Sequence, residues 1–133
     1  GIFHPLKRKV LGRIKKIINK EFGLNFVEQK LSYDSLWEKI LRKEFNEHIY
    51  SGAFVDWDNT PRKSTRGLVI SGGNPDKFKN YFSKLYEKSK QSNVPFVFIN
   101  AWNEWAEGTY LEPDERYGFS YLEAIKSTVD NIN

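Results

Sequence analysis

The sequence of 133 residues contains no cysteine and no methionine. The lack of cysteine excludes disulfides and thiolate metal sites, although it leaves the cellular compartment open. The lack of methionine means that Gly1 is not a translation start, so we expect the chain to be a piece of a longer protein. No secretory leader and no apolar run of membrane-spanning length are present, which predicts a soluble chain.

A broad positive surface is also lacking, although the formal net charge is +4. Seven of the 21 basic residues lie within residues 7–20, and the remaining 14 are outnumbered by the 17 acidic residues. Because the positive charge is local, we expect no nucleic-acid partner. The length suits one hydrophobic core but falls short of the roughly 200 residues that a complete (β/α)₈ barrel needs.

The basic residues belong to a predicted amphipathic helix over residues 5–21, with Pro5 in its first turn. Its apolar stripe consists of Leu6, Val10, Leu11, Ile14, Ile17 and Ile18. One interpretation of the helix is contact with a membrane surface, and the other is a solvated face on a helix that packs against a sheet. We expect a cytoplasmic protein, and this helix raises the alternative of a peripheral contact with the inner membrane.

Alternating strand and helix patterns follow. The predicted strands cover residues 49–57 and 94–99, with a shorter apolar piece at 68–70. The predicted helices cover residues 33–44, 74–90 and a last stretch from about residue 118. The last helix is expected to bury Phe119, Leu122, Ile125 and Val129. Ser35 with Glu38 matches a capping box, and Asn74 precedes Pro75 as a helix cap.

The strand at 94–99 is apolar on both faces, which is typical of a parallel strand covered by helices on both sides. Only residues 91–93 join it to the preceding helix, whereas 16 residues (58–73) and 17 residues (101–117) follow the two strands. Short helix-to-strand joins and long strand-to-helix loops are typical of an α/β barrel with its active site at the carboxyl ends of the strands.

Two glutamates follow the second of these strands. Glycosidic cleavage commonly uses one carboxylic acid to protonate the leaving oxygen and one carboxylate to support the electron-poor sugar carbon. Glu104 and Glu107 are therefore the candidate catalytic pair, whereas the alternative is solvated charge on a surface loop. If the segment is helical, residues three apart face the same side.

Three of the four tryptophans, Trp57, Trp102 and Trp105, also lie where strands end. Their rings suit stacking on a pyranose, and the alternative is that they pack on one another. Asn103 suits a hydrogen bond to a substrate hydroxyl or to a glutamate, and Tyr110 suits the rim of a site. Further rim candidates are Glu112, Asp114, Arg116 and Tyr117.

The segment Asp56-Trp57-Asp58 has the Asp-x-Asp form with which many nucleotide-sugar transferases hold Mg²⁺ or Mn²⁺. The following Asn59-Thr60-Pro61 favours an Asx-type turn instead, and no Gly-rich phosphate loop accompanies the motif. We therefore expect neither a bound metal nor a cofactor, and a metal-dependent glycosyltransferase stays an alternative.

Two motifs together carry a family resemblance: Trp57-Asp58-Asn59-Thr60-Pro61-Arg62, and the run from Asn100 to Asp114 with Tyr117-Gly118 after it. They resemble the C-terminal part of the WbsX-type proteins of bacterial polysaccharide loci, which are similar to the endo-α-mannosidase glycoside hydrolases. The resemblance covers roughly residues 33–128. It implies that residues 1–133 are the C-terminal portion of a glycoside-hydrolase-like (β/α)₈ TIM-type barrel, with residues 1–30 a basic helical region that it covers poorly.

By this resemblance Glu107 is the general acid/base, and Glu104 assists the sugar 2-hydroxyl in displacing the leaving group with net retention. Trp57, Asp58 and Asn59 join the substrate-binding residues. The hydrolases typically have His where this chain has Ala106. We predict a domain that acts on glycosidic bonds of a bacterial polysaccharide, with an oligosaccharide or polysaccharide as its partner. A noncatalytic sugar-binding or structural fragment is the remaining alternative.

Overall fold

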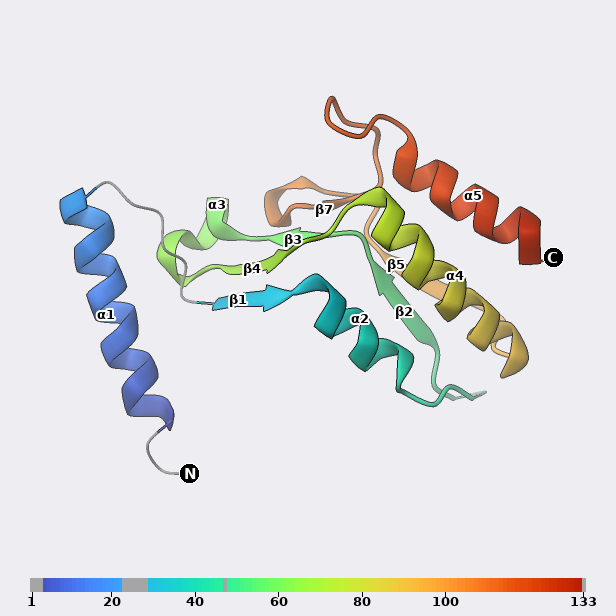
Figure 1. Cartoon of the computed structure of the whole chain (residues 1–133), viewed down its shortest axis with the longest axis horizontal. Helices are drawn as coiled ribbons and strands as arrows, with labels where there is room; N and C mark the ends of the chain where they lie inside the picture. The colour runs from blue at the N-terminus through green and yellow to red at the C-terminus, as the bar shows by residue number, and fades with distance from the viewer. Residues whose placement is uncertain (1–3, 23–28, 47, 133) are drawn as a thin grey trace.

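The computed structural model describes residues 4–22, 29–46 and 48–132 (Figure 1). The helices are α1 (His4–Phe22), α2 (Tyr33–Leu41), α3 (Thr60–Lys63), α4 (Pro75–Gln91) and α5 (Ser120–Ile132), with 3₁₀ turns η1 (Ser64–Arg66) and η2 (Trp105–Glu107). The strands are β1 (Gln29–Ser32), β2 (Ser51–Phe54), β3 (Trp57–Asp58), β4 (Leu68–Ser71), β5 (Val97–Asn100), β6 (Asn103–Glu104) and β7 (Thr109–Tyr110).

The described chain is an α/β domain, as the sequence predicts. Strands β2 and β5 pair in parallel, with Phe54 opposite Asn100 at their carboxyl ends, and α4 lies between them in the chain. In a second sheet β4 pairs in parallel with β1 and antiparallel with β3. Strands β6 and β7 form an antiparallel hairpin. Within the described residues these small sheets do not close into a barrel.

The predicted single strand over residues 49–57 is wrong, because the chain divides there into β2 and β3 in different sheets. The break falls at Val55 and Asp56, and Asp56 accepts a hydrogen bond from the backbone N–H of Trp57 (2.8 Å). Trp57 then pairs with Ile70 of β4. A carboxylate that bonds the next backbone N–H favours a turn over a continuous strand.

Helices α4 and α5 lie side by side (Figure 1), and α4 also contacts β2. Phe78 of α4 meets the ring of Tyr121 of α5 edge-on, with centroids 5.4 Å apart. A buried hydrogen bond of 2.7 Å joins the hydroxyls of Ser51 in β2 and Ser89 in α4. The aromatic core continues to Trp37 of α2, which stacks on Tyr81. These contacts hold one face of the two strands against a rigid helical layer.

The predicted N-cap of α4 is confirmed, whereas the predicted N-cap of α2 is wrong. Asn74 caps α4, because its side chain accepts from the N–H of Lys77 (2.9 Å). Helix α2 begins two residues before the predicted capping box and is capped by Ser32, whose hydroxyl accepts from the N–H of Ser35 (3.4 Å). The prediction of Ser35 as the cap is therefore wrong, and α2 ends at Leu41 instead of residue 44.

The buried face of α5 is also turned from the predicted one. Its buried residues are Tyr121, Ala124 and Thr128, whereas Phe119 is 63% exposed. Leu122, Ile125 and Val129 are half-buried. The reason is contact with α4, because Thr128 shares a hydrogen bond with Ser83 (2.8 Å) and Tyr121 packs on Phe78.

Strand β5 is covered on one face only, contrary to the prediction of helices on both sides. Val97 and Ile99 pack against the core, but Phe96 and Phe98 are exposed, Phe98 by 61%. Their rings form an exposed aromatic cluster with Tyr50, with centroids 6.0–6.5 Å apart. Exposed clusters of large apolar side chains often mark a surface that contacts another part of a protein or a ligand.

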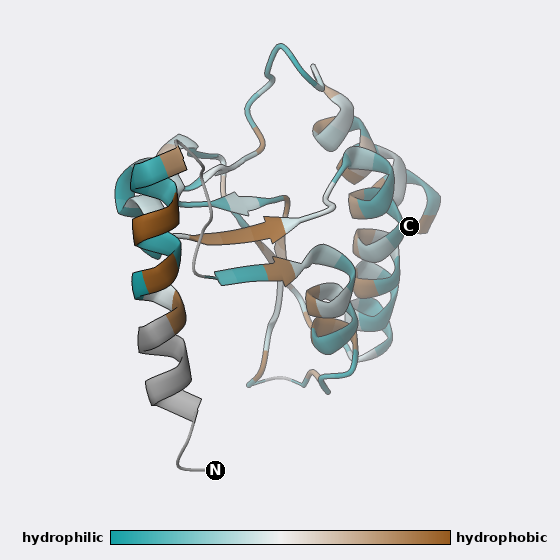
Figure 2. Cartoon of the chain, turned by 60° about the vertical axis from the view of Figure 1, so that its left-hand side comes forward, coloured by the Kyte–Doolittle hydropathy of each residue, from teal (hydrophilic) through white to brown (hydrophobic). Residues whose placement is uncertain are grey.

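Helix α1, which the sequence predicts over nearly the same residues, stands apart from the sheets and contacts η1 (Figure 1). Hydrophobic bands run along it (Figure 2), and Leu11, Ile14 and Ile17 are exposed. The side chains of Leu6 and Val10 lie outside the described part. Among the described helices none is long and apolar enough to cross a bilayer. Peripheral membrane contact through this helix stays a prediction.

Candidate functional site

The two candidate glutamates lie on one hairpin, residues 103–110, that follows the end of β5. Asn103 pairs with Tyr110 and Glu104 with Thr109, and η2 forms the tip. Thr109 is fully buried, and its hydroxyl donates to the carbonyl of Asn100 (2.8 Å). This carboxylate hairpin is therefore attached at its base to the carboxyl end of β5. Glu104 lies in a strand and Glu107 in the 3₁₀ turn, so they do not share a regular helix.

The tip of the carboxylate hairpin is attached as well. Gly108 has a φ of +63°, a left-handed conformation that non-glycine residues adopt at a cost. A Cβ atom on Gly108 would lie 3.0 Å from the backbone nitrogen of Asp58 and 3.2 Å from its Cβ. The glycine thus permits both the turn and the close contact with the segment after β2. The two motifs that carry the family resemblance meet at this point.

Replacing Gly108 by Ala is expected to displace the tip, because the added methyl meets the backbone of Asp58. Left-handed strain of about 1–2 kcal/mol and overpacking of about 1–3 kcal/mol add at this position. Gly118→Ala is the matched control, since Gly118 also has a positive φ (+54°) but open space around it. In the longer protein, Gly108→Ala should lower the melting temperature more than Gly118→Ala does. Equal effects of the two variants would contradict the tip contact.

Charge at the site is asymmetric. Glu107 forms an ion pair with Arg62 of α3, with Nη1 and Oε1 3.1 Å apart. The carboxylate of Glu104 is exposed and has no hydrogen bond or ion pair within the described part of the chain. One carboxylate is thus held by a cation and the other is open to a ligand.

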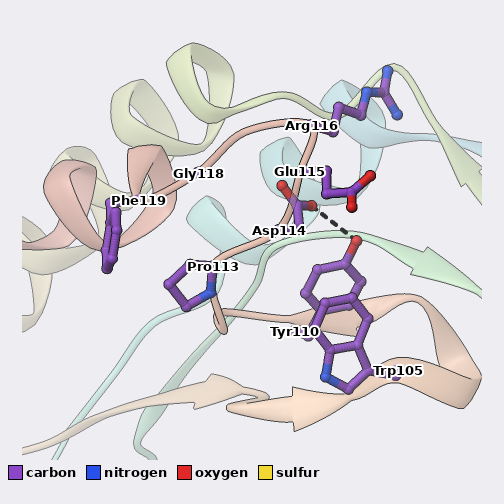
Figure 3. A pocket seen from close by; sticks show the side chains of 8 residues that line it. All are labelled: Trp105, Tyr110, Pro113, Asp114, Glu115, Arg116, Gly118 and Phe119. Carbon is purple, nitrogen blue, oxygen red and sulfur yellow. Dashed lines mark hydrogen bonds between the residues drawn. The ribbon is translucent and has the colours of Figure 1, made fainter.

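Trp105 forms a fixed, accessible aromatic surface next to the glutamates. Its ring stacks on Tyr110 with centroids 3.7 Å apart and planes 17° apart, and its indole N–H donates to Glu112 (2.6 Å). The side chain is still 48% exposed. Figure 3 shows the two rings one over the other. An aromatic ring that is immobilised before binding is a suitable platform for the apolar face of a sugar.

An open groove of about 660 Å³ extends from this ring. Its lining residues are Trp105, Tyr110, Pro113, Asp114, Glu115, Arg116, Gly118 and Phe119 (Figure 3). The hydroxyl of Tyr110 donates to Asp114 (2.9 Å), and burial together with this hydrogen bond raises the pKa of Tyr110. The groove combines flat apolar walls with fixed polar groups, the usual composition of a small-ligand site.

The other predicted substrate-binding residues after β2 are engaged in the loop itself. Asp58 accepts hydrogen bonds from the N–H and the hydroxyl of Thr60 (2.9 and 2.6 Å). Asn59 accepts from the N–H of Leu68 (2.7 Å). Trp57 is half-buried, and its indole N–H has no partner among the described residues. Substrate contact by these three residues stays a prediction. The hydrogen bonds of Asp58 and Asn59 fix the loop against which Gly108 packs.

Trp102 and Asn103 are exposed beside the pair. The carbonyl of Trp102 accepts from the N–H groups of Leu111 and Glu112 (2.9 and 3.0 Å), which fixes the path of the chain next to the groove. Both side chains are exposed, and their contact with a substrate stays a prediction.

Asp56 was predicted only as part of the Asp-x-Asp metal motif, and the structure places it in a cavity that the sequence did not predict. It lines a small cavity of about 50 Å³ with Tyr121, whose hydroxyl is buried without a partner in the described chain. Burial raises the pKa of Asp56. In residues 4–22, 29–46 and 48–132 no cluster of three or more metal-ligating side chains is found, so Asp56 and Asp58 gain no third acidic or histidine ligand there.

In α/β proteins with parallel strands, the functional site usually lies at the carboxyl ends of the strands. The candidate carboxylates and aromatic rings of this chain follow the carboxyl end of β5, which is the same position. The chain belongs to the family described as glycosyltransferase WbsX, whose model matches residues 4–125 and so includes α1. This match confirms the resemblance.

Two relatives are described as uncharacterized protein WxcX, from Xanthomonas campestris pv. campestris strains ATCC 33913 and B100. Each is 30% identical to this chain over 119 residues, which are 86% of the chain. The chain spans 16% of the length of these relatives. No solved structure matches the chain significantly.

Proposed function

We propose that the longer protein acts on glycosidic bonds of a bacterial polysaccharide and that this chain supplies its catalytic carboxylates. The observation that carries the proposal is the carboxylate hairpin, held by contacts of Thr109 and Gly108, with Glu107 paired to Arg62 and Glu104 exposed. The groove begins at Trp105 of the same hairpin, and neither glutamate is among its lining residues. Membership of a family named for glycosyl transfer supports the same class of chemistry.

In the proposed mechanism Glu107 donates its proton to the glycosidic oxygen as the bond to the sugar carbon breaks. Glu104 accepts the proton of the sugar 2-hydroxyl, whose oxygen displaces the leaving group from the opposite face. Glu107, now a carboxylate, then removes a proton from the incoming hydroxyl, whose oxygen attacks the sugar carbon and opens the three-membered ring with net retention. Glu104 returns its proton to the 2-oxygen that is released, so both glutamates regain their starting states. Trp105 and its groove hold the flanking sugar so that these atoms stay aligned.

The same residues serve hydrolysis and transfer. If water is the incoming group the product is a shortened glycan, and if a sugar hydroxyl is the incoming group the product is a new linkage. The family name favours transfer. The retaining carboxylate mechanism follows from the resemblance of the run Asn103-Glu104-Trp105-Ala106-Glu107-Gly108 to the hydrolases, and it serves either outcome. A metal-dependent transferase built on Asp56 and Asp58 is a second candidate, although Asp58 is bonded to Thr60.

We further propose that β2 and β5 are the last two strands of a (β/α)₈ barrel. The two strands pair in parallel, and the aromatic cluster on one of their faces is open. This arrangement fits two neighbouring strands of a barrel whose interior is completed by side chains from the rest of the protein. The relatives, of which this chain spans 16%, are long enough to contain such a barrel.

The test is product analysis on the longer protein. Incubation with polysaccharide from the source organism, with and without EDTA, should give shortened or re-linked glycans by mass spectrometry without a metal requirement. Activity that needs both a nucleotide-sugar and a divalent cation would favour the metal-dependent transferase. Oligosaccharide binding without any product would favour a noncatalytic role.

A further inference from the structure

The ion pair between Arg62 and Glu107 joins two segments that lie 45 residues apart in the chain. Arg62 belongs to α3, after β3, and Glu107 belongs to η2, after β6. The side chain of Glu107 is 24% exposed and that of Arg62 is 56% exposed. The pair therefore lies at the edge of the site, where a substrate can still reach the carboxylate.

The backbone on both sides of the ion pair is fixed by other contacts. The loop that leads into α3 is held by hydrogen bonds that Thr60 donates to Asp58 and Leu68 donates to Asn59. The tip of the carboxylate hairpin is held by the contact of Gly108 with Asp58. Because these contacts do not involve the guanidinium, loss of the Arg62 side chain should leave the backbone in place. Exposed ion pairs also contribute little to folding stability.

Arg62 is the only cation within ion-pair distance of Glu107 among the described residues. Arg66 lies on the neighbouring η1 and is exposed, without an ion pair in the described part of the chain. Arg116 of the groove lies over the ring of Tyr117, with its guanidinium carbon 4.7 Å from the centroid. The charge of Arg62 is therefore directed to one of the two candidate catalytic carboxylates.

We propose that Arg62 is a positioning residue for Glu107: it orients the acid/base carboxyl group and stabilises the carboxylate that forms when the proton passes to the glycosidic oxygen. The inference rests on the proposed function. The guanidinium 3.1 Å from Oε1 fixes the direction of the carboxyl group and places positive charge where negative charge develops during bond cleavage. The effect should appear where cleavage depends on proton donation and vanish where it does not.

The experiment compares Arg62→Met, Arg62→Gln and Arg62→Lys in the longer protein, with Arg66→Met as the matched control. For the oligosaccharide that the wild type processes, kcat/KM of Arg62→Met and Arg62→Gln should fall roughly tenfold, between the few-fold effect of an exposed pair and the larger effect of a preorganised catalytic group. For a dinitrophenyl glycoside of the same sugar, whose leaving group needs no proton, the fall should be less than about twofold. Arg62→Lys should recover part of the loss, because it keeps the charge.

Melting temperatures of all variants should match the wild type within a few degrees. Equal losses of kcat/KM on both substrates, or no difference between Arg62→Met and Arg66→Met, would overturn the inference. Glu107→Gln is measured in parallel. Full activity of Glu107→Gln would overturn the proposed function and the inference with it, whereas an inactive Glu107→Gln with a fully active Arg62→Met would overturn the inference alone.

Discussion

Replacing Glu107 or Glu104 by Gln in the longer protein is expected to reduce turnover by roughly 10²–10⁴-fold each, the usual contribution of a positioned acid or base. The amide has nearly the shape of the carboxyl group but neither donates nor accepts the proton that the mechanism moves. Folding should be preserved, because Glu104 is exposed and the pair of Glu107 with Arg62 lies at the surface. Steady-state kinetics and thermal melting on the same samples separate the two effects.

The two variants should differ on activated substrates. A dinitrophenyl glycoside does not need the proton from Glu107, so Glu107→Gln should retain much more of the cleavage step than Glu104→Gln does. Glu123→Gln on the exposed side of α5 is the control for a lost negative charge and should have wild-type turnover. Unchanged turnover of either active-site variant would remove that residue from the mechanism.

The second large effect concerns residues 1–133 expressed alone, which should aggregate or remain molten and inactive. The aromatic cluster of Tyr50, Phe96 and Phe98 is open to water, and α1 exposes Leu11, Ile14 and Ile17. The β2–β5 pair also has two outer edges without a partner strand in the described residues, and such edges invite pairing with other chains. Within the longer protein we expect the same residues to be ordered.

Size-exclusion chromatography and denaturant unfolding of the isolated chain test this expectation. A sharp, reversible, monomeric transition would show a self-sufficient domain and would count against the barrel proposal. Phe96→Ser with Phe98→Ser gives a reciprocal test. The double variant should make the isolated chain more monodisperse but should destabilise the longer protein, because there the two rings are expected to fill the barrel interior.

Long, strongly periodic segments with side-chain caps could be predicted from the sequence. Helix α4 is the clearest case, because Asn74 and Pro75 mark its start and the stripe from Phe78 to Leu85 sets its buried face. The carboxyl end of β5 was predicted to within one residue, since an apolar run followed by carboxylates is a local signal, although the strand begins at Val97 instead of Val94.

Features that depend on tertiary contacts could not be predicted. The split of residues 49–57 depends on pairing between Trp57 and Ile70, and the buried face of α5 depends on the partner that α4 presents. Arg62 was part of a recognised motif, yet only the folded chain brings it to Glu107. The contact of Gly108 with Asp58 could not be predicted either, because a single glycine in a sequence does not indicate which distant segment packs against it.

The attachment of the carboxylate hairpin at both ends has a consequence for the rate of substrate capture. A loop held at its base alone pivots, and a ligand must then wait for, or induce, the arrangement that binds it. The neighbouring residues Thr109 and Gly108 each contact a different segment, Asn100 and Asp58, and these two contacts restrict such pivoting. Association should therefore show a single kinetic phase whose rate rises linearly with ligand concentration, without the plateau that a closing lid imposes.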